Sequence, residues 1–317
     1  MEYIKISLKG VLELFILGFI GFYLTKKRFI NSSGLDALSK LVVGICLPAM
    51  IFYNLMVNFG FEQYKNWWTF PLLSLGICLL GLIVGFLFLP FLTNNLEYRK
   101  QFLSLVIFQN SGYLPLVLLS AILPKDKIQV MFIYMFLFLL GFNIIIWSIG
   151  VYLITFSRNR RFEGKSFFSP PVLSTILSLF LVYFKINKFI PNFFYKPLSI
   201  LGDSTLPLAM LIVGGSLAEL NFNKTDNKSI LFLILAKLII MPVLGLFLII
   251  RFNLSELLGL LLLIQLAVPS ATSLSLITRH YQQEDLLISA GVFWTHIISL
   301  FTLPLFLSLY FAYFPIK

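Results

Sequence analysis

Long uncharged, apolar segments recur along this 317-residue chain, and they decide its fold class. A helix needs about 20 apolar residues to cross the hydrocarbon core of a bilayer. The pattern therefore predicts an all-α polytopic membrane protein with ten transmembrane helices. Their predicted ranges are 8–25, 39–57, 69–93, 100–122, 129–155, 167–184, 197–219, 229–250, 254–278 and 286–312.

Two of these segments are interrupted by residues that disfavour a continuous helix, 109–115 and 265–273. In the first, Gly112 permits unusual backbone angles and Pro115 lacks a backbone donor. In lipid, a broken helix survives only where protein, a cavity or a ligand satisfies the freed backbone groups. Paired breaks in corresponding halves point to the binding site of a transporter, although a simple proline kink is the alternative for either break alone.

The two breaks are separated by the same distance as two other prolines. Pro207 follows Pro48 by 159 positions, and Pro269 follows Asn110 by 159 positions. Ten helices divided near the middle leave five in each half, and an odd number makes the second half enter from the opposite side. We therefore predict two inverted five-helix repeats. The predicted boundaries are 1–157 for the first repeat, 158–166 for a cytoplasmic connecting loop and 167–317 for the second repeat.

Composition agrees with a membrane protein, because 59% of the residues are hydrophobic and 12% are charged, against about 25% charged in soluble domains. The net charge of +11 is attributed to membrane topology rather than to nucleic-acid binding. We expect a multi-pass protein of the cell (plasma) membrane, surrounded by lipid, with both termini outside. The two densest basic groups then face the cytoplasm: Lys26, Lys27, Arg28 and Lys40, and Arg158, Arg160, Arg161 and Lys165.

The residues around the two breaks favour an anion as ligand. A helix that restarts after a break presents free N–H groups and a partial positive charge. Lys237, a basic residue deep in a span, balances a substrate anion in this interpretation; pairing with a carboxylate or snorkelling to the interface are the alternatives. The predicted substrate-binding residues are Asn110, Ser111, Gly112, Pro115, Pro269, Ser270, Gln265 and Lys237.

Three ionisable residues in or near spans are candidates for coupling to a proton or sodium ion: Glu13, Asp203 and His296. Interfacial positions or helix caps are the alternative for the two carboxylates, and an interhelical hydrogen bond is the alternative for the histidine. The chain has two histidines and two cysteines, which suggest neither a metal cluster nor a nucleophilic triad. We therefore expect no enzyme activity, no catalytic residue, no metal and no cofactor.

Short motifs spread over nearly the whole chain resemble the auxin efflux carrier (AEC, PIN-like) family. The chain is similar to bacterial-type members, which lack the long central loop of the plant proteins. One departure is Ser169, where the family often has asparagine. The motifs are Leu47-Pro48, Asn110-Ser111-Gly112, Ser169-Pro170, Leu206-Pro207, Gly214-Gly215-Ser216-Leu217, Pro269-Ser270-Ala271 and His280-Tyr281.

The resemblance implies ten helices in two inverted repeats. Helices 4 and 9 are then broken and cross each other at their prolines. It assigns Asn110 and Pro115 to the first crossover, and Pro269 and Ser270 to the second. It also implies a scaffold made of helices 1, 2, 6 and 7, a mobile transport domain made of helices 3–5 and 8–10, and a homodimer through the scaffold. Family members move organic anions.

These observations predict a secondary transporter that exports small organic anions by elevator-type alternating access. The substrates that the resemblance implies are carboxylates such as auxin-like acids, malate or malonate. One alternative is a sodium- or proton-coupled organic anion symporter of the bile-acid-symporter type, which sodium dependence of uptake would reveal. Another is a membrane ligand receptor built on a transporter fold, which would bind ligand without flux.

Overall fold

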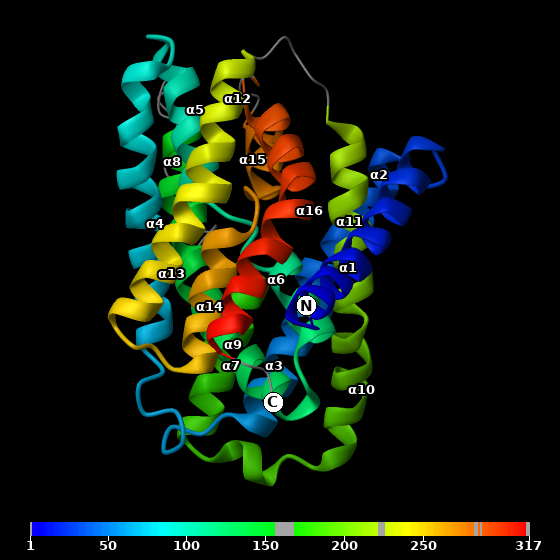
Figure 1. The fold of residues 1–317 in the computed structure, drawn as a ribbon. Coiled ribbons are helices and arrows are strands. Elements are labelled where there is room, and N and C mark those ends of the chain that lie inside the picture. Colours follow the sequence, from blue (N-terminus) through cyan, green and yellow to red (C-terminus); the bar gives the residue numbers. More distant parts are fainter. Residues whose placement is uncertain (1, 156–167, 221–225, 282–284, 286, 315–317) are drawn as a thin grey trace.

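The computed structural model is an all-helical bundle (Figure 1), and it describes residues 2–155, 168–220, 226–281, 285 and 287–314. Within these ranges, seven helical segments are long and apolar enough to cross a membrane. The predicted class, an all-α polytopic membrane protein, is therefore confirmed. The predicted connecting loop 158–166 lies outside the described residues. The seven segments are Ser7–Lys26, Ser32–Asn58, Thr69–Phe91, Lys125–Thr155, Asn192–Glu219, Asn227–Arg251 and Ile288–Tyr313.

Several long segments consist of shorter helices joined by a π-helical turn or a bend. A π turn keeps the chain helical while it shifts the register of the side chains. In the first half the elements, with η for a short π or 3₁₀ helix, are α1 (Glu2–Lys26), α2 (Ser32–Leu41), η1 (Val42–Cys46), α3 (Leu47–Asn58), α4 (Thr69–Phe88), η2 (Leu89–Phe91), α5 (Leu96–Ile107), α6 (Tyr113–Ile122), α7 (Lys125–Ile145), η3 (Ile146–Gly150) and α8 (Val151–Thr155).

The second half repeats this style of construction. Its elements are α9 (Pro170–Tyr183), η6 (Ile186–Phe189), α10 (Asn192–Asp203), α11 (Thr205–Glu219), α12 (Asn227–Ile234), η7 (Leu235–Ile240), α13 (Met241–Arg251), α14 (Glu256–Ala267), α15 (Ser273–His280) and α16 (Ile288–Tyr313). The predicted spans 100–122 and 254–278 are each divided into two shorter helices, α5 with α6 and α14 with α15.

Polar caps set the starts of helices at the ends of the bundle. The Asn95 side chain accepts a hydrogen bond from the Tyr98 amide at the start of α5, and Asp226 does the same for Lys228 at the start of α12. A capping side chain satisfies one of the backbone donors that a helix start leaves free. Hydrogen bonding of the Lys228 amide to the Asp226 carboxylate also lowers the pKa of that carboxyl.

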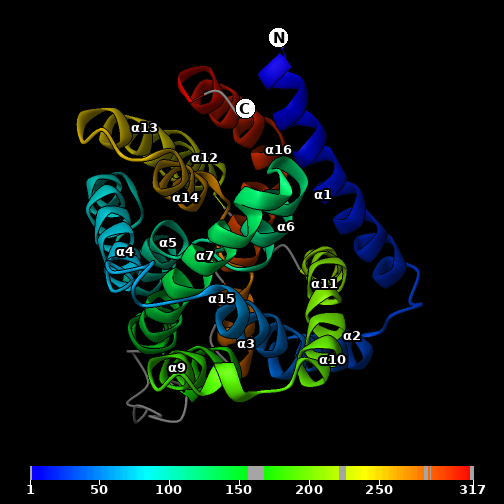
Figure 2. The ribbon, with the colours of Figure 1, turned by 90° about the horizontal axis from the view of Figure 1, so that it is seen from below.

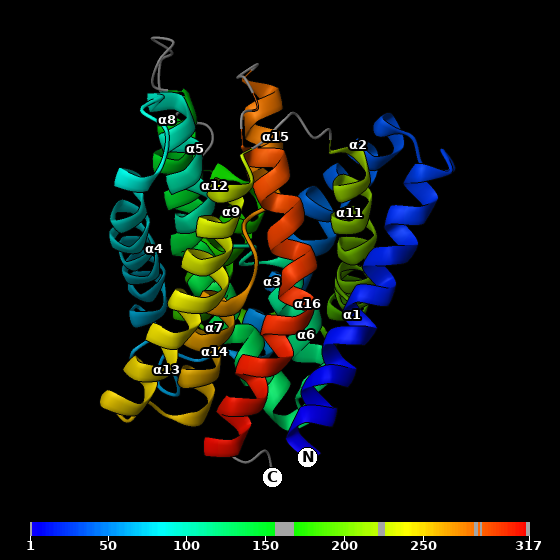
Figure 3. The same ribbon diagram turned by 45° about the horizontal axis from the view of Figure 1, so that its top comes forward.

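Two groups of helices lie beside each other in the view from below (Figure 2). In one group α1 packs on α11, and α3 packs on α9 and α10; in the other α4 packs on α5 and α7, and α13 packs on α14. The start of α1 and the end of α16 lie at the same end of the bundle (Figure 3).

The contact between α1 and α11 depends on glycine. A Cβ atom added to Gly214 would collide with the backbone of Gly18, and one added to Gly21 would collide with the backbone of Leu211. Small residues let two membrane helices approach until their backbones touch. Gly214 and Gly21 therefore permit the close packing of α1 on α11.

Candidate functional site

The two helix breaks lie directly against each other. Gln109 and Ser270 form an antiparallel β-bridge. The backbone N–H of Asn110 donates to the Pro269 carbonyl at 2.8 Å, and the backbone N–H of Ala271 donates to the Phe108 carbonyl at 2.9 Å. Each break thus satisfies backbone groups of the other, as an interrupted helix at membrane depth requires. Asn110 and Pro269, the two positions separated by 159 residues, are opposite each other in this pairing.

Side chains from the second break and from η7 satisfy carbonyls at the end of α5. The Ser270 hydroxyl donates to the Leu105 carbonyl at 2.7 Å, and the Lys237 ammonium nitrogen donates to the Val106 carbonyl at 2.8 Å. The last carbonyls of a helix have no partner within the helix and carry a partial negative charge. A hydroxyl and a cation are suitable partners for them, so the end of α5 is fixed although it is buried.

Gln265 joins the second broken segment to the first. Its side-chain amide nitrogen donates to the Ser111 carbonyl at 3.1 Å and lies 3.4 Å from the sulfur of Met135. The Ser270 amide lies 3.3 Å from the hydroxyl oxygen of Thr295, to which it donates. These contacts tie the two paired breaks, hereafter the crossing, to α7 and α16.

His296 of α16 contacts the side chain of Asn110. Its Nδ1 lies 2.8 Å from the Val292 carbonyl oxygen, which can only accept a hydrogen bond, so Nδ1 carries the proton in the neutral ring. Its Nε2 lies 3.3 Å from Asn110 Nδ2 and accepts from it. We infer this tautomer from the contacts, and it leaves the second amide hydrogen and the oxygen of Asn110 for a ligand.

A cavity of about 180 Å³ adjoins the crossing. None of the described side chains that line it is charged, although several carry amides or hydroxyls. The first turns of α6 and α15 begin at its wall, so their backbone N–H groups, which lack acceptors within the helix, are close to it. The lining residues are Val43, Leu47, Gln109, Asn110, Ser111, Gly112, Tyr113, Leu139, Phe142, Asn143, Ile146, Trp147, Ser169, Pro171, Ala271, Thr272 and Ser273.

Several buried polar atoms at the crossing have no hydrogen-bond partner among the described residues. They are Nε2 and Oε1 of Gln109, Oγ of Ser111 and Oε1 of Gln265. Buried polar groups are rarely left unpaired, because burial without a partner costs about 1–3 kcal/mol per group. Their presence at this place indicates a site where water or a polar ligand belongs.

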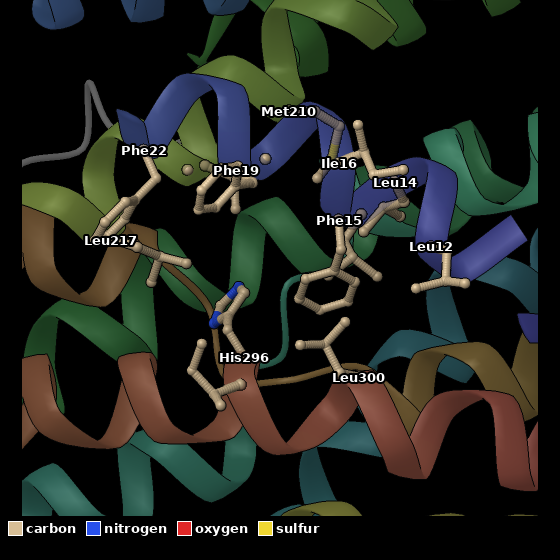
Figure 4. Close-up of a pocket in the computed structure, with 15 residues that line it drawn as sticks. Leu12, Leu14, Phe15, Ile16, Phe19, Phe22, Met210, Leu217, His296 and Leu300 are labelled. Carbon is tan, nitrogen blue, oxygen red and sulfur yellow. The ribbon is translucent and has the colours of Figure 1, made fainter. Parts of the chain in front are cut away.

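A second cavity, of about 320 Å³, lies between α1, α11 and α16 (Figure 4). His296 is the one polar side chain among its lining residues, which are otherwise apolar or glycine. Figure 4 shows the His296 ring projecting from α16 among Phe15, Leu217 and Leu300. The apolar lining offers nothing to hold a carboxylate, so this cavity is a poor candidate for an anion site.

The structure brings most of the predicted substrate-binding residues to the crossing. Asn110, Ser111 and Gly112 line the polar cavity. The others support the breaks without lining it: Gln265, Pro269, Ser270 and Lys237 bind backbone groups or carry them, and Pro115 is buried in the first turn of α6.

The candidates for coupling differ in position. Glu13 is exposed on α1, where it lies 3.8 Å from Lys9, and Asp203 is exposed at the end of α10. Neither lines the polar cavity. His296 alone among the three reaches the crossing, through Asn110.

Sequence reasoning did not single out Tyr113 and Trp147, which both line the polar cavity. Tyr113 is the first residue of α6, and Trp147 is four residues after Asn143 on the same helical segment. The sequence did contain a signal for them, since each lies about one helical turn from an asparagine inside a predicted span. The hydroxyl of a tyrosine or the N–H of a tryptophan needs a hydrogen-bond partner when it is buried in lipid.

A helical bundle with membrane-length apolar helices, in which two helix breaks pair beside a polar cavity, has the architecture of a membrane transport protein. The family described as Membrane transport protein matches residues 6–164 and 159–307, and the chain belongs to it. This is the family of auxin efflux carrier-like proteins that the sequence motifs indicated. The protein is therefore a transport protein and not an enzyme.

Relatives with transporter names extend this result. The uncharacterized transporter MJ1031 of Methanocaldococcus jannaschii is 25% identical over 319 residues, which cover 95% of this chain and 97% of that protein. PIN-LIKES 1 of Arabidopsis thaliana is 21% identical over 91% of this chain and 75% of its own length. PIN-LIKES 6 of the same plant is 28% identical over 38% of this chain and 28% of its own length.

Proposed function

We propose that this protein is a secondary transporter that exports small organic anions by elevator-type alternating access. The substrates are carboxylates such as auxin-like acids, malate or malonate. The observation that carries the proposal is the pairing of Gln109 with Ser270 beside a cavity that has amides, hydroxyls and helix starts but, among the described residues, no charged side chain.

The carboxylate binds at the starts of α6 and α15, where free N–H groups and the helix dipoles favour an anion. Asn110 donates the amide hydrogen that His296 does not use, and the unpaired Ser111 hydroxyl donates a second hydrogen bond. Gly112 lets the backbone turn into α6. Because none of the described lining residues carries a fixed charge, the anion is held weakly enough to leave on the other side of the membrane.

The chain forms two inverted five-helix repeats, with the α5–α6 and α14–α15 pairs as the crossover helices. The antiparallel pairing of positions 159 residues apart supports a pseudo-two-fold axis at the crossing. The scaffold consists of α1, α2–α3, α9 and α10–α11, and the other helices form the moving unit. The polar cavity is lined by residues of both units, Leu47 and Pro171 from the scaffold and Asn110 and Trp147 from the moving unit. A cavity at the boundary between the units is the arrangement that sliding between them needs.

Membrane potential provides the driving force. An anion leaving a cell gains about 2.3 kcal/mol per charge at 100 mV, inside negative, so export needs no coupling ion. With both termini outside in the plasma membrane, the polar cavity extends toward the cytoplasmic end of the bundle, because Ser169 at the start of α9 belongs to its wall.

The test is flux in proteoliposomes. Purified protein is reconstituted, and the uptake and efflux of labelled malonate, malate and indole-3-acetate are measured in sodium-free buffer. We expect saturable flux of at least one acid, with a tenfold or larger loss in Asn110→Ala. The matched control is Asn187→Ala, whose amide donates to the Met56 carbonyl away from the cavity.

Two results would contradict the proposal. Binding of these acids without flux would indicate a ligand receptor, and flux that requires sodium would indicate a sodium-coupled symporter. Undiminished flux in Asn110→Ala would remove Asn110 from the site.

A further inference from the structure

Lys237 is a fully buried basic residue in the middle of the long segment formed by α12, η7 and α13. Its exposed fraction is 0%. Its ammonium nitrogen donates to the Val106 carbonyl at 2.8 Å, and Val106 is the second-last residue of α5. None of the ion pairs among the described residues includes Lys237.

The helices packed around η7 are α4, α5, α12, α13, α14 and α16. Cys78 of α4 is the titratable side chain that interacts electrostatically with Lys237. The carboxylates of α5 and α14 are Glu97 and Glu256, and both lie in the first turn of their helix, at the end far from the break. The negative partner of the Lys237 ammonium is therefore the carbonyl end of α5.

This contact places a cation at a special point of the crossing. The ends of broken half-helices with their free carbonyls are where transporters of this architecture hold coupling ions. Here a side chain of the protein itself, the Lys237 ammonium group, already occupies the carbonyl end of α5. Six residues after the last residue of α5, α6 begins at Tyr113, and the free N–H groups of its first turn favour an anion.

We propose that Lys237 is a built-in cation of the moving unit, which balances the charge of the bound anion and replaces a coupling ion. This inference rests on the proposed function. When a monovalent anion is bound, the moving unit carries no net charge at the crossing. When the site is empty, it carries the charge of Lys237 alone. An inside-negative potential then acts on the inward return of the empty unit, and the complete cycle still moves one negative charge outward.

Exchange and net efflux separate these two steps. In exchange, a labelled monovalent anion on one side is traded for the same unlabelled anion on the other, so the unit crosses loaded in both directions. In net efflux, the unit must return empty. Proteoliposomes with a potassium gradient and valinomycin set the potential, and labelled indole-3-acetate is the probe.

For the wild type we expect exchange that does not change with potential and net efflux that does. In Lys237→Gln the loaded unit carries the charge of the anion, so exchange becomes sensitive to potential. The apparent affinity for the anion also falls by about tenfold, since a buried charge no longer attracts it. Lys237→Arg keeps the charge and keeps the wild-type pattern. Cys78→Ala is the matched control, because it alters the neighbour of Lys237 without changing the charge.

The inference is overturned if wild-type exchange is itself sensitive to potential, and this arm needs no variant to fold. It is also overturned if Lys237→Gln, with a wild-type melting profile, keeps exchange that is insensitive to potential. Absence of both exchange and efflux in the wild type for every acid tested would instead count against the proposed function.

Discussion

Nε2 of His296 lies 3.3 Å from Nδ2 of Asn110, so a histidine of α16 fixes the orientation of an amide at the wall of the polar cavity. The other ring nitrogen is held by the Val292 carbonyl, which leaves Nε2 as the acceptor. A rigid imidazole therefore decides which atoms of Asn110 face a ligand. Such support around a binding residue reduces the conformational freedom that binding must otherwise remove.

Removal of this support should weaken substrate binding. In His296→Leu the Asn110 amide loses its acceptor, and one hydrogen bond is worth about 0.5–1.5 kcal/mol. We expect the KM of anion flux to rise roughly twofold to tenfold. His296→Gln should restore part of the affinity, because its side-chain oxygen can accept from Asn110. The measurement is concentration-dependent flux in proteoliposomes.

The control for this series is Trp294→Phe, which changes a partly exposed neighbour on α16. It should leave KM unchanged. If His296→Leu has the KM of the wild type, the contact with Asn110 is structural and plays no part in binding.

The hydroxyl of Ser270 should contribute to stability. It is fully buried and donates to the Leu105 carbonyl from the opposite break. Ser270→Ala leaves that carbonyl unpaired at membrane depth, at a cost of about 1–3 kcal/mol. We expect a lower melting temperature in detergent, measured by intrinsic fluorescence. Ser308→Ala is the control, because the Ser308 hydroxyl bonds to carbonyls of its own helix, which keep their backbone partners. Equal melting temperatures for the two variants would contradict the prediction.

The membrane class and the approximate ranges of seven spans could be predicted from the sequence because hydropathy records them directly. The limits of the spans were harder to predict. In the structure α5 begins at Leu96, whereas the uncharged run behind the predicted span 100–122 begins at residue 101. The first turn contains Glu97 and Arg99, which a search for apolar residues excludes, but the Asn95 cap and the bundle end accommodate them.

The candidate site was predictable to the extent that its chemistry is local. Gly112, Pro115 and Pro269 mark the breaks in the sequence itself. The partners of the site residues were not predictable. Asn110 and His296 are 186 residues apart, and Lys237 and Val106 are 131 residues apart. Such contacts depend on how α16 and η7 pack against the crossing, and no periodic pattern in either segment contains this information.

The close contact of α1 with α11 should be intolerant of added volume. A methyl group at Gly214 would collide with the backbone of Gly18, which cannot move as a flexible side chain could. We expect Gly214→Ala to lower the melting temperature strongly or to reduce the yield of folded protein. Gly76→Ala is the matched control, since a Cβ atom there has no neighbour within 4 Å. A Gly214→Ala protein as stable as Gly76→Ala would show that the helices can separate without cost.

The ion pair of Arg279 and Glu219 should influence the rate of transport. Its two atoms lie 3.1 Å apart and join α15 to α11, which belong to different units in the proposed mechanism. The pair must then break in each cycle. Exposed pairs contribute about 0.2–1 kcal/mol, so Glu219→Gln should change the initial flux by roughly twofold to fivefold, with a smaller change at high salt. Glu219→Arg combined with Arg279→Glu should return the flux toward the wild-type value.

The control for this prediction is the pair of Lys127 and Glu256, with 2.7 Å between the charged atoms. It joins α7 to α14, which both belong to the moving unit. Lys127→Gln therefore leaves the contact between the units intact and should change the flux less than Glu219→Gln does. An equal effect of the two substitutions, or failure of the reversed pair to restore flux, would mean that α11 and α15 do not separate during transport. In that case the boundary between scaffold and moving unit would have to run elsewhere.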